Sequence, residues 1–282
     1  MLREMNDTNG VTGFTDRIGG RSVQSQKDVI EREKLMKTEA ESIVAEGRKR
    51  DLHLRLLGAM AFQARCPRYN FLTVKLNRAL SDIDFAAYST EKNQIDKMMR
   101  ELGYADQAMV SALFGSKRMI WDNKSNGMHV DVFFDKLEMN HTIPFLNRLE
   151  LEDLTIPLSD MLLEKMQIVH INEKDIVDSI MLLLEHDVTN SGPDTIDAHY
   201  LAKLLSNEWG FYYTVTTNLR KVQDRLATLA ELSEEDRARV SSRIETLLKI
   251  IEDQPKTLAW KIRARVGARS KWYDDVDSVG GG

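Results

Sequence analysis

Cysteine is almost absent from this chain, which contains Cys66 alone. A single thiol excludes an intrachain disulfide and a zinc site built from several cysteines, and it predicts a reducing compartment, by default the cytoplasm. The six histidines show no HExxH or His-x₃-His spacing, so a zinc enzyme is not expected either. No metal ligand stands near Cys66 in the sequence, so we expect a small, semi-buried side chain there and not a reactive thiol.

Long apolar runs are also missing. No stretch approaches the roughly 18 apolar residues that span a bilayer, and the N-terminal residues lack the apolar core of a signal peptide. We therefore expect no insertion into a membrane. The net charge is −5, so the chain as a whole does not attract nucleic acid, and any such binding would need a local basic patch.

The composition that is present is that of a globular protein. With 282 residues, 42% of them hydrophobic and 29% charged, the chain can bury a large core and is long enough for two domains. We predict a flexible arm over 1–27, an α/β (α+β) domain with a small mixed sheet over 28–188, a helical C-terminal domain over 189–273 and a flexible tail over 274–282. The segment VTNSGPD, 188–194, is the best boundary because Asn, Ser, Gly and Pro favour turns.

Helices and strands are expected to alternate in the first domain. Hydrophobic spacing and turn residues predict helices at 27–50, from Gly58 onward, from Ser89 or Thr90 to Leu102 with Gly103 as the stop, at 105–115, from a Ser159 cap to 169, and at 172–186. Strands are predicted at 52–57, in SDIDFAAYS (81–89), in the hairpin 117–123 with 128–134, and at 154–158. Three helices follow at 196–210, 211–232 and 233–253, the last with a capping box at Ser233 and Asp236.

SDIDFAAYS contains two carboxylates one residue apart. If this run is a strand, alternation sends Ile83 and Phe85 to one face and Asp82 and Asp84 to the other. Two like charges on one face repel each other unless they are solvated or share a cation, and a hard divalent cation such as Mg²⁺ binds carboxylate oxygens. The stretch therefore predicts a metal site, or else a solvated pair of acids.

Further features in chain order suit the same chemistry. A Gly58-Ala59 turn follows a strand and opens a helix, and Asp131 is a lone acid on a later strand. Nucleotidyl transfer uses metal ions held by carboxylates to align a triphosphate. Backbone N–H groups of a small-residue turn at a helix N-terminus can receive the phosphates.

This pattern resembles the nucleotidyltransferase superfamily with the polymerase-β-like fold. The motifs of that family are hG[GSA], [DE]h[DE]h and h[DE]h, and here they read Leu57-Gly58-Ala59, Asp82-Ile83-Asp84-Phe85 and Val130-Asp131-Val132. The later segment LTIPLSDMLLEKMQIVHINEKDIVDSIMLLL looks like the region after the third acid in AbiEii-type abortive-infection or toxin-like members. Lys165 matches their helix lysine, and Lys174, Asp175 and Asp178 match their lysine-aspartate run. The resemblance covers about 52–188.

The resemblance implies a site and a reaction. Asp82, Asp84 and Asp131 would hold Mg²⁺ or Mn²⁺, with Asp131 as a third ligand or general base, and Lys165 would contact phosphate or developing charge. Contacts to the NTP would come from Gly58, Ala59, Arg78, Lys165 and Asp175. The acceptor would be a hydroxyl of a tRNA end, a protein or a small molecule, and a toxin-like role would imply an antitoxin partner.

Two departures from the family pattern leave a second function open. Ala59 stands where many active members have Ser, and 60–80 forms a long insertion before Asp82. A catalytically idle nucleotide-binding or interaction module is the alternative. The basic residues of the insertion, Arg65, Arg68, Lys75 and Arg78, suit either a solvated loop or contacts to a triphosphate.

Other candidates each have a plain structural alternative. His129 shares a strand face with Asp131 but is more readily a surface histidine, and Lys165 would ordinarily be an exposed lysine on an amphipathic helix. The segment 256–273 interleaves basic and aromatic residues without an acid. It suits an RNA acceptor, or else an amphipathic helix that packs Leu258, Ile262 and Val266 and turns a basic face outward.

Overall fold

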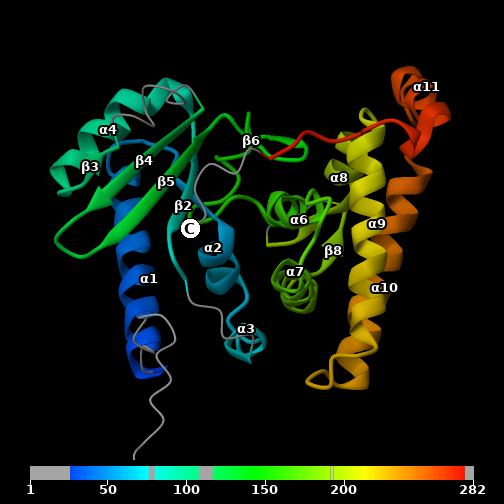
Figure 1. Ribbon diagram of the computed structural model, residues 1–282, viewed down its shortest axis with the longest axis horizontal. Helices are drawn as coiled ribbons and strands as arrows, with labels where there is room; N and C mark the ends of the chain where they lie inside the picture. The colour runs from blue at the N-terminus through cyan, green and yellow to red at the C-terminus, as the bar shows by residue number, and fades with distance from the viewer. Residues whose placement is uncertain (1–25, 76–79, 108–116, 191, 193, 277–282) are drawn as a thin grey trace, which may run out of the picture.

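A computed structural model describes residues 26–75, 80–107, 117–190, 192 and 194–276. It is mixed α/β, with a mixed sheet and a helical C-terminal region. In Figure 1 the long β4–β5 hairpin lies on the left, α8 to α11 stand on the right, and α2, α6 and α7 lie between them. Arg78 and the predicted N-terminal arm up to residue 25 lie outside the described residues, as does most of the predicted tail.

Among the described residues, five strands form the main sheet in the order β1-β2-β5-β4-β3. They are β1 (Arg55–Leu57), β2 (Ile83–Ala87), β3 (Ala105–Asp106), β4 (Arg118–Asn123) and β5 (Met128–Phe134). Strands β2 and β5 run parallel, and the other neighbouring pairs are antiparallel. Parallel neighbours need a crossover connection, and here α4, β3 and β4 lie between β2 and β5 in the chain.

The register of the two central strands brings distant acids together. Asp84 of β2 lies opposite Asp131 of β5, and Leu57 of β1 lies opposite Asp84. Ile83 and Phe85 alternate with the acid and are fully buried, so the predicted segregation of the two faces is confirmed. One face of the sheet centre is apolar, and the other carries the carboxylates.

Helices of the N-terminal half flank this sheet. They are α1 (Gln26–Arg48), α2 (Gly58–Arg65), α3 (Phe71–Lys75), the short 3₁₀ helix η1 (Ser89–Glu91) and α4 (Lys92–Glu101). Gly103 follows α4 with φ +86°, so the predicted glycine stop is confirmed. The predicted Ser89 or Thr90 cap is wrong, because η1 and α4 begin without a side-chain cap bond.

One predicted helix is replaced by a strand where it is described. Ala105 and Asp106 form β3 and pair with Asp122 and Trp121 of β4. The edge of the neighbouring hairpin offers unpaired backbone groups, and this pairing outweighs the local helical pattern. The remainder of that predicted helix, 108–116, lies outside the described residues.

After the sheet the chain forms β6 (Lys136–Glu138), β7 (Thr142–Pro144), α6 (Leu158–Met166) and α7 (Glu173–Glu185). Backbone bonds join Leu56 to Leu154 and Ile156, which confirms the extended segment before α6. The Ser159 cap is wrong: Ser159 is buried inside α6, and its hydroxyl accepts the N–H of Asp197. The predicted start of α7 is confirmed, because Asn172 caps it through its side chain.

Helices complete the described chain. A short parallel pair, β8 (Val188–Thr189) with β9 (Ile196–Asp197), precedes α8 (Ala198–Leu205), α9 (Trp209–Leu226), α10 (Glu234–Asp253), α11 (Leu258–Val266) and the 3₁₀ turn η2 (Gly267–Arg269). The Ser233 hydroxyl accepts the N–H of Asp236, as the capping box predicts. No helix in the described ranges is long and apolar enough to cross a membrane.

The hydrophobic core continues across the predicted boundary at 188–194. Helix α7 packs against α9 and α10, and α6 packs against α8 and α9. Residues from the sheet, from α6 and α7 and from α8 to α10 belong to one buried cluster. The helices of the C-terminal region therefore pack directly on α6 and α7.

Candidate functional site

The three predicted carboxylates meet on one face of the sheet. Asp82 directly precedes β2, Asp84 lies within it, and Asp131 lies beside Asp84 on β5. All three line a cavity of about 300 Å³. Asp131 is almost fully buried at 2% exposure, whereas Asp82 and Asp84 are half-buried.

The glycine turn lies directly against the acid pair. Gly58 has φ +69°, and a Cβ at this position would stand 2.5 Å from Oδ2 of Asp84. Glycine is needed here both because the left-handed backbone favours it and because the carboxylate occupies the space of a side chain. Two motifs that are distant in sequence thus form one structural unit.

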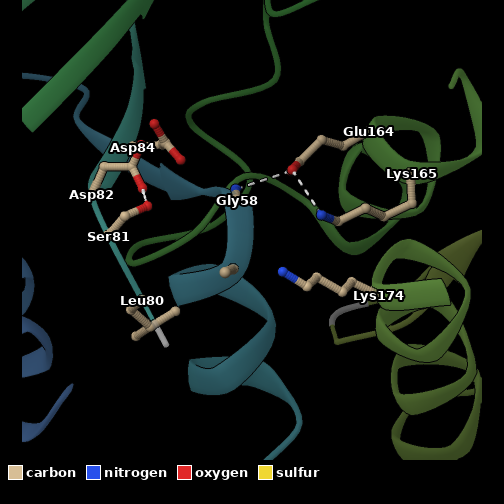
Figure 2. Close-up of a pocket in the computed structure, with 9 residues that line it drawn as sticks. Gly58, Leu80, Ser81, Asp82, Asp84, Glu164, Lys165 and Lys174 are labelled. Carbon is tan, nitrogen blue, oxygen red and sulfur yellow. Dashed lines mark hydrogen bonds and ion pairs between the residues drawn. The ribbon is translucent and has the colours of Figure 1, made fainter. Parts of the chain in front are cut away.

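A second cavity, of about 290 Å³, adjoins the first (Figure 2). It is lined by Gly58, Ala59, Leu80, Ser81, Asp82, Asp84, Glu164, Lys165 and Lys174. Figure 2 shows the ammonium groups of Lys165 and Lys174 reaching in from α6 and α7 on the side of Gly58 opposite Asp82. The cavity therefore has Asp82 and Asp84 along one wall and the two lysines, together with Glu164, along the other, and the first turn of α2 lies between them.

Lys165 is buried and held by acids of α7. Its Nζ lies 3.1 Å from Oδ1 of Asp175 and 3.2 Å from Oδ2 of Asp178. It also lies 5.1 Å from the centre of the Phe62 ring. The structural alternative for Lys165, an exposed lysine on an amphipathic helix, is wrong. Asp175 therefore lies beside the cavity as an ion-pair partner of the Lys165 ammonium group.

Glu164 occupies the N-terminus of α2. Its Oε2 accepts the N–H of Gly58 at 3.1 Å, and its Oε1 lies 3.7 Å from Nζ of Lys165. Burial raises the pKa of Glu164, and the Lys165 ammonium and the Gly58 N–H oppose that rise. A helix N-terminus attracts anions, so this carboxylate takes the position where a phosphate would be received. The sequence did not indicate Glu164.

Arg118 of β4 binds Asp131 with both arms of its guanidinium group. Nε donates to Oδ1 of Asp131 at 2.7 Å, and Nη2 donates to Oδ2. The guanidinium carbon lies 5.2 Å from the centre of the Phe133 ring. The hydrogen bonds to Asp131 raise the pKa of Arg118. The sequence did not indicate this arginine either.

Asp84 lies where negative charge accumulates. Burial raises its pKa well above the ordinary value, and the neighbouring carboxylates of Asp82, Asp131 and Glu164 raise it further, while Arg118 lowers it. A cation between the carboxylates would relieve this repulsion. Oxygen donors are the ligands that Mg²⁺ and Mn²⁺ prefer, so Asp82 and Asp84 fit such an ion.

The third predicted ligand has a different partner. Among the described residues, no group of three or more His, Cys, Asp or Glu side chains is arranged to hold a metal ion. Asp131 faces Arg118 with both of its oxygens. Asp131 therefore differs from the other two predicted ligands, Asp82 and Asp84, in being held by Arg118 through both oxygens.

The described arginines of the insertion do not join the site. Arg65 pairs with Glu152 and Asp194, and Arg68 pairs with Glu185. Neither arginine lines the two cavities with the carboxylates. The side chain of Lys75 and all of Arg78 lie outside the described residues.

Two other candidates are structural. His129 lies 2.7 Å from Asp122 and is absent from the lining of both cavities, as expected of a surface histidine. Cys66 is completely buried, deeper than predicted, and burial raises the pKa of its thiol. A reactive thiol would need the opposite shift.

The basic segment 256–273 packs differently from its helical alternative. Leu258, Ile262 and Val266, for which the helical pattern predicts burial, are 74%, 55% and 43% exposed. Trp260 instead packs edge-on against Tyr212 of α9, and the Arg263 guanidinium lies 4.8 Å from the Trp209 ring. Aromatic packing onto α9 outweighs aliphatic packing because the rings are larger. This orientation turns Trp260 toward α9.

Searches of known family models and of curated proteins find no match to this chain. Its function is therefore inferred from its residues, from the motifs that they form and from their arrangement in space.

Proposed function

We propose that the chain is a Mg²⁺- or Mn²⁺-dependent nucleotidyltransferase, which moves a nucleoside monophosphate from an NTP to a hydroxyl group and releases pyrophosphate. The carrying observation is the convergence of three separated motifs: the Gly58 turn contacts Asp84, and Asp84 lies beside Asp131. The same three motifs carry the resemblance to the polymerase-β-like superfamily. Lys165 and Lys174 lie across the cavity from Asp82 and Asp84. An NTP that binds with a metal ion needs both kinds of group, carboxylates for the metal and cations for the phosphates.

Asp82 and Asp84 are the residues that would hold the cation. When bound, it would neutralise the triphosphate and favour in-line displacement at the α-phosphate. Burial raises the pKa of Asp84, and the neighbouring carboxylates of Asp82, Asp131 and Glu164 raise it further. A cation bound between Asp82 and Asp84 would offset this repulsion.

The phosphates would lie at the start of α2. The N–H groups of Gly58 and Ala59 belong to the first turn of this helix, where the helix dipole favours an anion. Lys174 is exposed at the cavity and can contact the outer phosphates, while Lys165 is fixed from behind by Asp175 and Asp178. The hydroxyl proton of the acceptor would pass to Asp131 or to a water beside it.

The acceptor and the biological role belong to the same proposal. A tRNA end, a protein hydroxyl or a hydroxylated small molecule would approach from the helical side, and RNA would use the basic residues of 256–273. By its AbiEii-type resemblance the chain would be the toxin of a toxin–antitoxin or abortive-infection pair, acting in the cytoplasm with an antitoxin as its partner.

The alternative function is an idle nucleotide-binding or interaction module. It is favoured by a specific observation: the protein's own groups occupy positions that ligands would use. Glu164 bonds the Gly58 N–H, and Arg118 bonds Asp131. A module without activity would keep these contacts when nucleotide is present.

Label transfer tests the proposal. Each α-³²P-labelled NTP with Mg²⁺ is offered to total tRNA, to cell protein and to a set of hydroxylated small molecules. We expect label in one pool, and its loss in the Asp82→Asn, Asp84→Asn double variant, whose fold is checked by circular dichroism. Label in no pool would contradict the enzyme, and NTP binding that survives in the double variant would support the idle module.

A further inference from the structure

The strand register fixes a cation beside the acids. In the antiparallel pair β4–β5, Arg118 lies opposite Phe133, two residues beyond Asp131. Arg118, Asp131 and Phe133 therefore share one face of the sheet, and a long side chain reaches such a diagonal neighbour. On the other side of Asp131, Asp84 is its partner in the parallel register. The Arg118 guanidinium thus belongs to the carboxylate face.

We propose that Arg118 takes the place of one metal ion, so that this site binds a single divalent cation at Asp82 and Asp84. This inference rests on the proposed nucleotidyltransferase function. In a two-metal site, ions about 3.5–4 Å apart share the carboxylates and stabilise both the attacking and the leaving oxygen. Here the protein itself supplies the positive charge beside Asp131, through the guanidinium group of Arg118.

The chemistry of Arg118 and the burial of Asp131 support the proposal that Arg118 replaces a metal ion. Its guanidinium is protonated at every relevant pH and binds both oxygens of a carboxylate in one plane. Those two oxygens of Asp131 accept hydrogen bonds from Arg118, and they are the ligand atoms that a second metal ion would need. Asp131 is 2% exposed, and separating a buried ion pair is costly because it leaves an uncompensated charge.

Among the described residues, Lys165 is the other cation that lines this cavity, and it is already shared by Asp175 and Asp178. An arginine at a transferring phosphoryl group stabilises developing charge as a metal ion does, which assigns Arg118 a role beyond holding Asp131.

Counting bound Mn²⁺ tests the inference. The full chain is titrated with Mn²⁺ by electron paramagnetic resonance, alone and with α,β-methylene analogues of the four NTPs. We expect one ion per wild-type chain and two in Arg118→Gln, in which Asp131 is released. Arg100→Gln, which removes an exposed arginine paired with Asp96 on α4, should keep one ion.

A second variant keeps the test decisive if Arg118→Gln does not fold. Asp131→Asn should retain one Mn²⁺, because Asp131 binds Arg118 and not the ion. Two ions in the wild type with an analogue, an unchanged count in a folded Arg118→Gln, or loss of the ion in Asp131→Asn would each overturn the single-ion site. These results would leave the proposed transferase standing, whereas a wild type that binds no Mn²⁺ under any condition would overturn both.

Discussion

At the scale of single residues, Gly58 is the most constrained position of the site. Its φ of +69° costs a side-chain-bearing residue about 1–2 kcal/mol, and a Cβ would also stand 2.5 Å from the Asp84 carboxylate. We expect Gly58→Ala to lose more stability than the backbone cost alone and to weaken Mn²⁺ binding by about tenfold or more. Urea unfolding and Mn²⁺ titration measure the two effects.

Gly127 provides the matched control for this substitution. It has φ +68°, but among the described residues nothing lies within 4 Å of the position that a Cβ would take. Gly127→Ala should therefore lose about 1–2 kcal/mol and keep the affinity for Mn²⁺. Equal effects of the two substitutions would show that contact with Asp84 does not matter.

Under the proposed function, Glu164 would compete with an incoming phosphate for the N-terminus of α2. Because its carboxylate accepts the Gly58 N–H at 3.1 Å, we expect Glu164→Gln to bind inorganic triphosphate about tenfold more tightly, which corresponds to about 1.4 kcal/mol. Calorimetry with triphosphate measures the change. Glu185→Gln removes a carboxylate that pairs with Arg68 away from both cavities, and its affinity should stay at the wild-type value. Weaker binding by Glu164→Gln would mean that Glu164 assists the ligand.

Asp84 makes the metal-free stability depend on pH. Its folded-state pKa is raised, so the folded protein binds a proton there more tightly than the unfolded chain. Its contribution to stability is therefore fully present below the unfolded pKa and is lost as pH rises through the raised value. In the presence of a chelator, we expect the Tm to fall as pH rises from mildly acidic to neutral.

The reference for this pH profile is Asp84→Asn, which cannot ionise. It should flatten that part of the profile and raise the neutral-pH Tm, by about 2–4 °C for each kcal/mol of relieved repulsion. Mg²⁺ should stabilise the wild type but not the variant. A wild-type profile that rises with pH over the same window would refute the assignment of excess charge to Asp84.

The residues of the site differ in how far sequence could reveal them. Asp84 and Asp131 interrupt strongly apolar strands and Asp82 directly precedes one of them, so the alternation of the sequence predicts the face on which they lie. Arg118 and Glu164 carry no such pattern, because one charged residue in a strand or helix is ordinarily solvated. Their roles depend on contacts across 13 and 106 residues of chain.

At the scale of elements, α6 and α7 contribute two lysines of different kinds. Lys165 is buried with Asp175 and Asp178, so Lys165→Met should lose about 3–5 kcal/mol through the uncompensated acids. Lys174 is exposed, so Lys174→Met should stay within about 0.5 kcal/mol of wild type while raising the KM for NTP severalfold. Urea unfolding and steady-state kinetics separate the two. A strongly destabilised Lys174→Met would contradict this division.

Element identity was predictable wherever several residues agreed. The strands that carry the acids, and α7 with its Asn172 cap, follow from alternation and capping chemistry. The edge strand β3 did not, because its pairing with β4 is a tertiary contact that a helical pattern cannot report. For α11 the amphipathic alternative predicted a helix but not its inward face, which Trp260 and Arg263 decide through rings on α9.

At the scale of the whole molecule, the helical region and the sheet share one core. The sequence predicts two domains divided at 188–194, yet α7 packs against α9 and α10 across that division, and the buried cluster includes residues on both sides. Turn-forming residues mark a surface connection but do not report which faces are buried beyond it. The site depends on this packing, since α6 and α7 hold its lysines between the sheet and the C-terminal helices.

A shared core predicts that the two regions unfold together. Trp121 is fully buried in β4, whereas Trp209, Trp260 and Trp272 lie in or beside the C-terminal helices. One variant keeps Trp121 as its sole tryptophan, and Trp121→Phe keeps the other three. In each variant, urea transitions followed by fluorescence and by circular dichroism should coincide, as two-state unfolding requires. Separate midpoints for the Trp121 signal and for helix content would instead establish two independent domains and place the site at an interface between them.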